Sequence, residues 1–168
     1  MISLMTSQIL RILGSGPGHR SRSVGMAATA AFVIGGLLVV WSAYIHFHLW
    51  DEAQGYRHIS IIGPLFLLQS IGGLVVGVLV IAVRRVWAAL AGIGFAASTL
   101  VGFLLTVGLT DGLFNFKETW AAPFAHQAFA IEIAIIVVLL IAGALCLVGS
   151  ASTTRSGTAP SESALSGA

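Results

Sequence analysis

Charged side chains are scarce in this sequence. Only 8% of its 168 residues are Asp, Glu, Lys or Arg, whereas 57% are hydrophobic. A soluble domain of this length carries roughly a quarter charged residues. The deficit argues against a soluble domain and predicts a single membrane domain. The formal charge of +2 arises from eight basic and six acidic residues with no basic stripe, so it does not indicate a nucleic-acid partner.

Cysteine and catalytic motifs are lacking as well. The single cysteine, Cys146, lies in an apolar run, so an internal disulfide and a CxxC metal pair are both ruled out. The sequence contains no phosphate-binding loop, GxSxG elbow, HExxH motif or dinucleotide fingerprint. We therefore expect a protein that is not an enzyme and holds neither cofactor nor metal.

Long apolar runs dominate the chain instead. Four of them, at about 27–49, 61–83, 86–109 and 125–148, reach the roughly 20 residues that a helix needs to cross a bilayer. Lipid offers no water to backbone N–H and C=O groups, so each run must be helical. Ser60 is expected to cap the second helix, with Pro64 in its first turn.

The predicted fold is an all-α, four-helix transmembrane bundle that runs up-down-up-down. It occupies residues 26–148, between disordered segments at 1–25 and 149–168. Met26 is an alternative start to Met1, because the first apolar run opens directly after it.

The basic residues predict the orientation. Six of the eight basic residues lie before the first apolar run, between the second and third, or after the fourth. By the positive-inside rule, both termini are cytoplasmic in the inner (plasma) membrane. The six are Arg11, Arg20, Arg22, Arg84, Arg85 and Arg155; the other two are Arg57 and Lys117.

The two remaining loops combine charge with aromatic rings, and we call this set the polar cap. Such a surface suits a membrane-protein partner or lipid headgroups, with mere contact to lipid as the alternative. Its members are Trp50, Asp51, Glu52, Tyr56, Arg57, His58, Asp111, Phe116, Lys117, Glu118 and Trp120.

Glu132 lies within the fourth apolar run, roughly 12 Å from its start at about 1.5 Å per residue. An ionised acid facing lipid there costs about 2.5 kcal/mol or more, so Glu132 must face the bundle, be protonated or find a partner. Ser42, Gln69 and Thr99 fall at the same depth, which predicts a polar layer of four side chains. The layer either fixes helix register or forms a proton-carrying or ligand-binding site.

His46 lies near the end of the first run and His126 at the start of the fourth, both at the outer end of their helices, so they form a candidate haem pair. His126 is rotated about 120° from Glu132, and the two do not share a helix face. A metal site from His46, His58, Asp51 and Glu52 lacks recognisable ligand spacing.

Small residues recur at helical spacing within the runs. Gly73 and Gly77 form a GxxxG pair, and Gly92 with Ala96 forms a second pair of small residues. Such residues let helices approach closely in lipid. They predict packing inside the bundle, with homodimerisation as the alternative.

The stretch HFHLWDEAQGYRHISIIGPLFLLQ, followed by a GLFNFKE element, resembles a group of uncharacterised small actinobacterial four-helix integral membrane proteins. The resemblance covers roughly residues 26–148 and implies location and architecture without an activity.

The leading hypothesis is therefore a non-enzymatic accessory or interaction subunit in contact with the lipid bilayer. The alternative is a haem- or quinone-linked redox or proton-handling protein that uses His46, His126 and Glu132.

Overall fold

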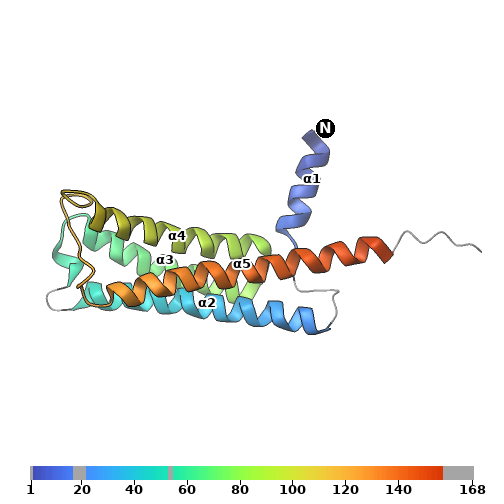
Figure 1. Ribbon diagram of the computed structural model, residues 1–168, viewed down its shortest axis with the longest axis horizontal. Coiled ribbons are helices and arrows are strands. Elements are labelled where there is room, and N and C mark those ends of the chain that lie inside the picture. Colours follow the sequence, from blue (N-terminus) through green and yellow to red (C-terminus); the bar gives the residue numbers. More distant parts are fainter. Residues whose placement is uncertain (1, 17–21, 53–54, 157–168) are drawn as a thin grey trace, which may run out of the picture.

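The computed structural model describes residues 2–16, 22–52 and 55–156, and the regular elements within them are helices joined by loops. Four long helices form the bundle: α2 (Arg22–Asp51), α3 (Ile62–Val83), α4 (Val86–Gly108) and α5 (Ala125–Ser156). Figure 1 shows them side by side, with α1 (Ile2–Leu13) standing away from one end. The short 3-10 helix η1 (Tyr56–His58) lies in the loop between α2 and α3. The predicted all-α four-helix bundle is confirmed.

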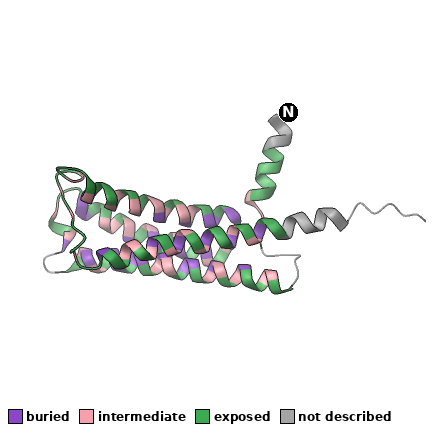
Figure 2. Cartoon of the chain, in the orientation of Figure 1, coloured by how far each residue is buried: buried purple, intermediate pink, exposed green. Residues whose placement is uncertain are grey.

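All four long helices are long and apolar enough to span a membrane. Their outward faces carry exposed aliphatic side chains, such as Leu68 at 66% and Ile71 at 58% exposure, and exposed residues run along the outside of the bundle in Figure 2. A soluble protein rarely exposes apolar surface on this scale. The surface fits lipid as the surrounding solvent.

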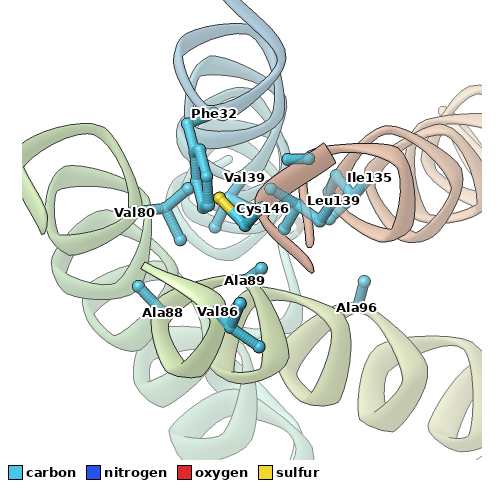
Figure 3. Packing of buried hydrophobic residues seen from close by; sticks show 11 residues of the cluster. Phe32, Val39, Val80, Val86, Ala88, Ala89, Ala96, Ile135, Leu139 and Cys146 are labelled. Carbon is cyan, nitrogen blue, oxygen red and sulfur yellow. The ribbon is translucent and has the colours of Figure 1, made fainter. Parts of the chain in front are cut away.

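The core lies nearer the Arg84 end of the bundle, where all four helices contribute apolar side chains (Figure 3). Phe32 of α2, Val80 of α3 and Leu139 of α5 are fully buried there, together with alanines of α4. Small side chains on α4 leave room for the larger ones opposite, which is the close packing expected of helices in lipid.

Both pairs of small residues face other helices of the same chain. A Cβ on Gly77 would lie 2.8 Å from the Gly36 carbonyl oxygen of α2, and one on Gly73 would lie 2.9 Å from the Ala43 Cβ. A Cβ on Gly92 would clash with Cδ1 of Leu139 on α5. Packing inside one chain is thus enough to explain these residues.

Both terminal segments differ from the predicted disorder. Helix α1 covers much of the segment 1–25, and α2 already begins at Arg22. The backbone N–H of Val86 donates to the Ser15 carbonyl at 3.1 Å, which ties the end of α1 to the start of α4. At the other end α5 continues to Ser156, because no proline interrupts a helix that is already nucleated. Residues 17–21 and 157–168 lie outside the described residues.

The predicted Ser60 cap is wrong. Helix α3 begins at Ile62, and Ile61 precedes it with φ 67° and ψ −50°, without a side-chain cap. The N–H of Ile62 donates to the Ser60 carbonyl at 2.8 Å, so a tight γ-turn replaces the serine cap.

Candidate functional site

A pocket of about 340 Å³ lies at the end of the bundle where the α2–α3 and α4–α5 loops are. These loops are on the left in Figure 1. All four long helices line the pocket, and the two loops that connect α2 to α3 and α4 to α5 close its top. We call it the loop-end pocket. Its wall is mainly aliphatic and aromatic, with a few polar side chains, as in most small-molecule sites.

Glu132 of α5 lines this pocket and is only 1% exposed. The Ser42 hydroxyl of α2 donates to its Oε1 atom. Its other oxygen, Oε2, is buried and has no hydrogen-bond partner among the described residues. A buried carboxyl oxygen without a partner is costly and marks a place where a ligand or a water would bind.

His46 of α2 also lines the pocket and is 8% exposed. Its Nδ1 lies 2.9 Å from the Ser42 carbonyl oxygen. Because a carbonyl only accepts, Nδ1 carries the proton and Nε2 of the neutral ring remains an acceptor. Ser42 therefore connects to both ionisable side chains, one through its hydroxyl and one through its carbonyl.

Gln69 of α3 and Thr99 of α4 complete the polar level. The Gln69 amide donates to the Thr99 hydroxyl, and both side chains line the pocket. The four residues expected at one depth thus form two hydrogen-bonded pairs, Ser42 with Glu132 and Gln69 with Thr99. Each pair joins two helices and fixes their relative register.

Aromatic rings form much of the remaining wall. Phe66 lies between the His46 ring, at 5.2 Å between centroids, and the Tyr56 ring, at 4.4 Å. On the opposite side, Phe103 and Phe129 line the pocket and pack against Trp120 at 4.9 and 5.2 Å. These rings give the pocket a rigid apolar surface.

A strap across the top of the pocket joins the two loops. The Tyr56 hydroxyl donates to Oε2 of Glu118 at 2.5 Å, and the Glu118 N–H donates to the Thr106 carbonyl at 3.3 Å. Burial, with the Glu118 carboxylate adding to it, raises the pKa of Tyr56 well above its ordinary value. Tyr56 thus stays protonated and the strap stays intact at neutral pH.

The pocket also opens sideways. Leu68 of α3 and Ser98 of α4 line it, and both are exposed on the outside of the bundle. The gap between α3 and α4 therefore leads from the pocket to the surface that lipid would cover. At the same level the Gln69–Thr99 pair joins the two helices.

Most of the charged cap residues lie outside the pocket, and three of them contact one another. Arg57 lies 3.5 Å from Asp51 and donates to His58 at 3.0 Å, and Glu52 lies 3.1 Å from His48. Lys117 donates to the Thr110 carbonyl at 3.1 Å, Asp111 is exposed, and Trp50 stacks on Phe47. Only Tyr56, Phe116 and Glu118 of the polar cap line the pocket.

The structure does not bring His126 to the pocket that His46 lines. His126 is exposed and stacks on Trp120 at 5.5 Å between ring centroids. A haem held between these two histidines would require both rings to face one space, so this pair does not fit the group. Within the described residues, no cluster of three His, Cys, Asp or Glu side chains is placed to hold a metal ion.

Three phenylalanines of the aromatic wall were missed in the sequence. Each lies three residues before a polar side chain of the pocket: Phe66 before Gln69, Phe103 before Thr106, and Phe129 before Glu132. Residues three apart share a helix face. This repeated spacing is the signal that finds them.

No protein-family model matches the chain, and searches of curated proteins and of solved structures also found no match.

Proposed function

We propose that this multi-pass membrane protein binds a small amphiphilic molecule in the loop-end pocket and is not an enzyme. The observation that carries the proposal is Glu132, a carboxyl buried at 1% exposure, lining the pocket and unpartnered at Oε2. A carboxyl that only fixed helix register would have both oxygens paired, because an unpaired one destabilises the fold.

The shape and lining of the pocket support an amphiphile. Its volume of about 340 Å³ falls at the small end of the usual range for ligand sites. The ligand's head would lie among Glu132, His46 and Gln69, and its apolar chain would leave between α3 and α4 past Leu68. A molecule dissolved in the bilayer reaches such a site without crossing water.

In this proposal the chain lies in the bacterial plasma membrane with both termini cytoplasmic, as the basic residues predict. The loop-end pocket then lies toward the outer leaflet. The resemblance to small actinobacterial membrane proteins supports the same location. The charged residues of the polar cap remain available to a protein partner, which gives the chain the role of an accessory subunit.

A matched pair of variants on α5 tests the proposal. Ala128 lines the pocket, whereas Ala130 is exposed two residues later and does not. The protein is extracted from its own membranes in polymer discs and released from them in the gas phase. Native mass spectrometry then measures whether a small molecule stays bound. We expect a bound small molecule on wild type and on Ala130→Leu, and its loss on Ala128→Leu, whose side chain fills the pocket. Equal retention by both variants would contradict the proposal.

A second candidate is a proton-handling or redox protein that binds a quinone. The observation that favours it is that His46 and Glu132 both line the pocket and both contact Ser42. His126 has no part in this version. Difference absorption spectra of the purified protein, oxidised against reduced, test it. A quinone band favours this candidate, and a Soret band favours haem. If neither band appears, the result favours binding without redox chemistry.

A further inference from the structure

We infer that the ligand's head donates hydrogen bonds and carries no negative charge, as an alcohol or an amine does. This inference rests on the proposed function, because it names the class of molecule that the loop-end pocket takes. It follows from which hydrogen-bond donors and acceptors of the pocket lining are already used within the protein.

Hydroxyl donors along the wall are already used within the protein. Thr99 donates to the Phe95 carbonyl at 3.0 Å, Ser98 donates to the same carbonyl at 2.7 Å, and Thr106 donates to Phe103 at 2.7 Å. A hydroxyl has one proton to give. None of these three side chains can donate to a ligand without first breaking a bond to its own helix.

The remaining donors that face the pocket are committed in the same way. The Tyr56 hydroxyl donates to Glu118, and the His46 Nδ1–H group donates to the Ser42 carbonyl. Gln69 gives one amide proton to Thr99 and keeps a second. This second amide proton is the one side-chain donor left over in the described lining.

Acceptors, in contrast, are in surplus. Glu132 Oε2 has no partner, His46 Nε2 is an acceptor in the neutral ring, and Gln69 keeps its carbonyl oxygen. The three side chains belong to α5, α2 and α3, and all three line the pocket. A head with only acceptors would leave these three atoms without hydrogen bonds. Buried polar atoms without partners would destabilise the complex.

Charge selects against an anionic head. The described lining holds two carboxyl groups, Glu132 and Glu118, and neither lysine nor arginine. A phosphate or carboxylate head would enter a water-poor site beside two carboxyl groups, with no cation to pair with. Ordinary anionic lipids are therefore excluded from the head position, although they surround the helices.

Four dodecyl amphiphiles with matched chains test the inference: dodecanol, dodecylamine, dodecyl methyl ether and dodecyl phosphate. Wild-type protein in phosphatidylcholine nanodiscs is titrated with each, and retention is measured by native mass spectrometry. We expect dodecanol or dodecylamine to half-saturate the protein at about tenfold lower concentration than the ether and the phosphate. A preference for the amine over the alcohol identifies ionic pairing with Glu132, and the reverse identifies a neutral hydrogen bond.

Glu132→Gln and Glu52→Gln form the matched variants, since both replace a carboxyl by an amide and only Glu132 lines the pocket. In Glu132→Gln the amide keeps its carbonyl toward Ser42 and presents an N–H donor in place of Oε2. The preference for alcohol over ether should fall at least about threefold there, and stay unchanged in Glu52→Gln.

The outcomes separate this inference from the proposed function. Equal or tighter retention of the ether or the phosphate by wild type overturns the inference, while binding itself stands. An unchanged preference in Glu132→Gln also overturns it. Failure of all four amphiphiles to be retained by wild type overturns both.

Discussion

Glu132 has two carboxyl oxygens in different situations. Oε1 accepts the Ser42 hydroxyl, whereas Oε2 is buried without a partner among the described residues. The first is a contact between α2 and α5 that supports the fold. The second destabilises the fold while it is unpaired, and it gains a hydrogen bond when a ligand binds. One side chain therefore combines a structural and a functional role, which separate substitutions can distinguish.

Ser42→Ala removes the hydrogen bond between the Ser42 hydroxyl and Oε1 of Glu132. Hydrogen bonds between membrane helices contribute about 0.6 kcal/mol on average and up to about 1.7 kcal/mol. We expect a loss within this range in the free energy of unfolding, measured by denaturation in mixed micelles. Ser70→Ala is the control, because Ser70 is also buried but donates to the Phe66 carbonyl of its own helix at 2.7 Å. Equal losses in both variants would contradict an interhelical role for Ser42.

Tyr56 makes the strap sensitive to alkaline pH. Burial and Glu118 raise its pKa in the folded state above the value of about 10 that applies in the unfolded chain. The folded state thus favours the protonated phenol. Its contribution to stability is present in full below about pH 10 and is lost as the pH rises above that value.

An absorbance titration of Tyr44→Phe checks this expectation, because Tyr56 is then the one tyrosine left. We expect tyrosinate to form at a higher pH in the folded protein than in denaturant. Glu118→Gln, in the same background, should bring the two titrations closer together, since the carboxylate adds to the shift. Coincident titrations in folded and unfolded protein would show that the strap does not form.

Helices α2 and α3 approach each other through glycine rather than through interdigitating large side chains. Gly36 and Gly77 lie opposite each other, so that a Cβ on either would come within 2.8 Å of the other's carbonyl oxygen. This contact sets the spacing of two walls of the loop-end pocket. The pocket's shape therefore depends on residues that do not line it.

Gly77→Ala should separate α2 from α3. The new Cβ would lie 2.6 Å from Cγ2 of Val40 and 2.8 Å from the Gly36 oxygen, so backbone must move at a cost of about 1–3 kcal/mol. Gly94→Ala on α4 is the matched control, because a Cβ there meets nothing within 4 Å. We expect it to be neutral or slightly stabilising, since alanine favours helix. Equal thermal stability of the two variants would contradict the packing.

At the scale of elements, hydropathy was enough to place the four helices, because each run had to satisfy its backbone in lipid. Counting depth along the runs also brought Ser42, Gln69, Thr99 and Glu132 to one level. Depth does not give the direction in which a side chain points, so His126 was grouped with His46 although it packs on Trp120. The γ-turn at Ile61 and helix α1 were not predicted, because they depend on tertiary contacts and their local sequence signals are weak.

The whole molecule is asymmetric along its long axis. Within the described residues, the loop end carries the acids, the aromatic strap and the pocket, whereas Arg11, Arg22, Arg84 and Arg85 lie toward the other end. A bundle with four spans places both termini on one side of the membrane. The charge difference predicts that this side is the cytoplasm.

Reporter fusions test the orientation. Alkaline phosphatase folds to an active form outside the cytoplasm, and green fluorescent protein matures within it. We expect fluorescence from fusions at both termini and phosphatase activity from an insertion near Asp111, which is exposed in its loop. Phosphatase activity at either terminus would reverse the orientation and place the pocket toward the cytoplasmic leaflet.

An amphiphile taken from the bilayer into the loop-end pocket would lie close to a tryptophan. Trp120 packs against Phe103 and Phe129 of the pocket wall, so its fluorescence reports on what enters. The decisive measurement is quenching by brominated dodecanol in nanodiscs, with Trp41, Trp50 and Trp87 replaced by Phe. We expect quenching that saturates and that unbrominated dodecanol reverses. Quenching that rises linearly with bilayer concentration, without reversal, would contradict it.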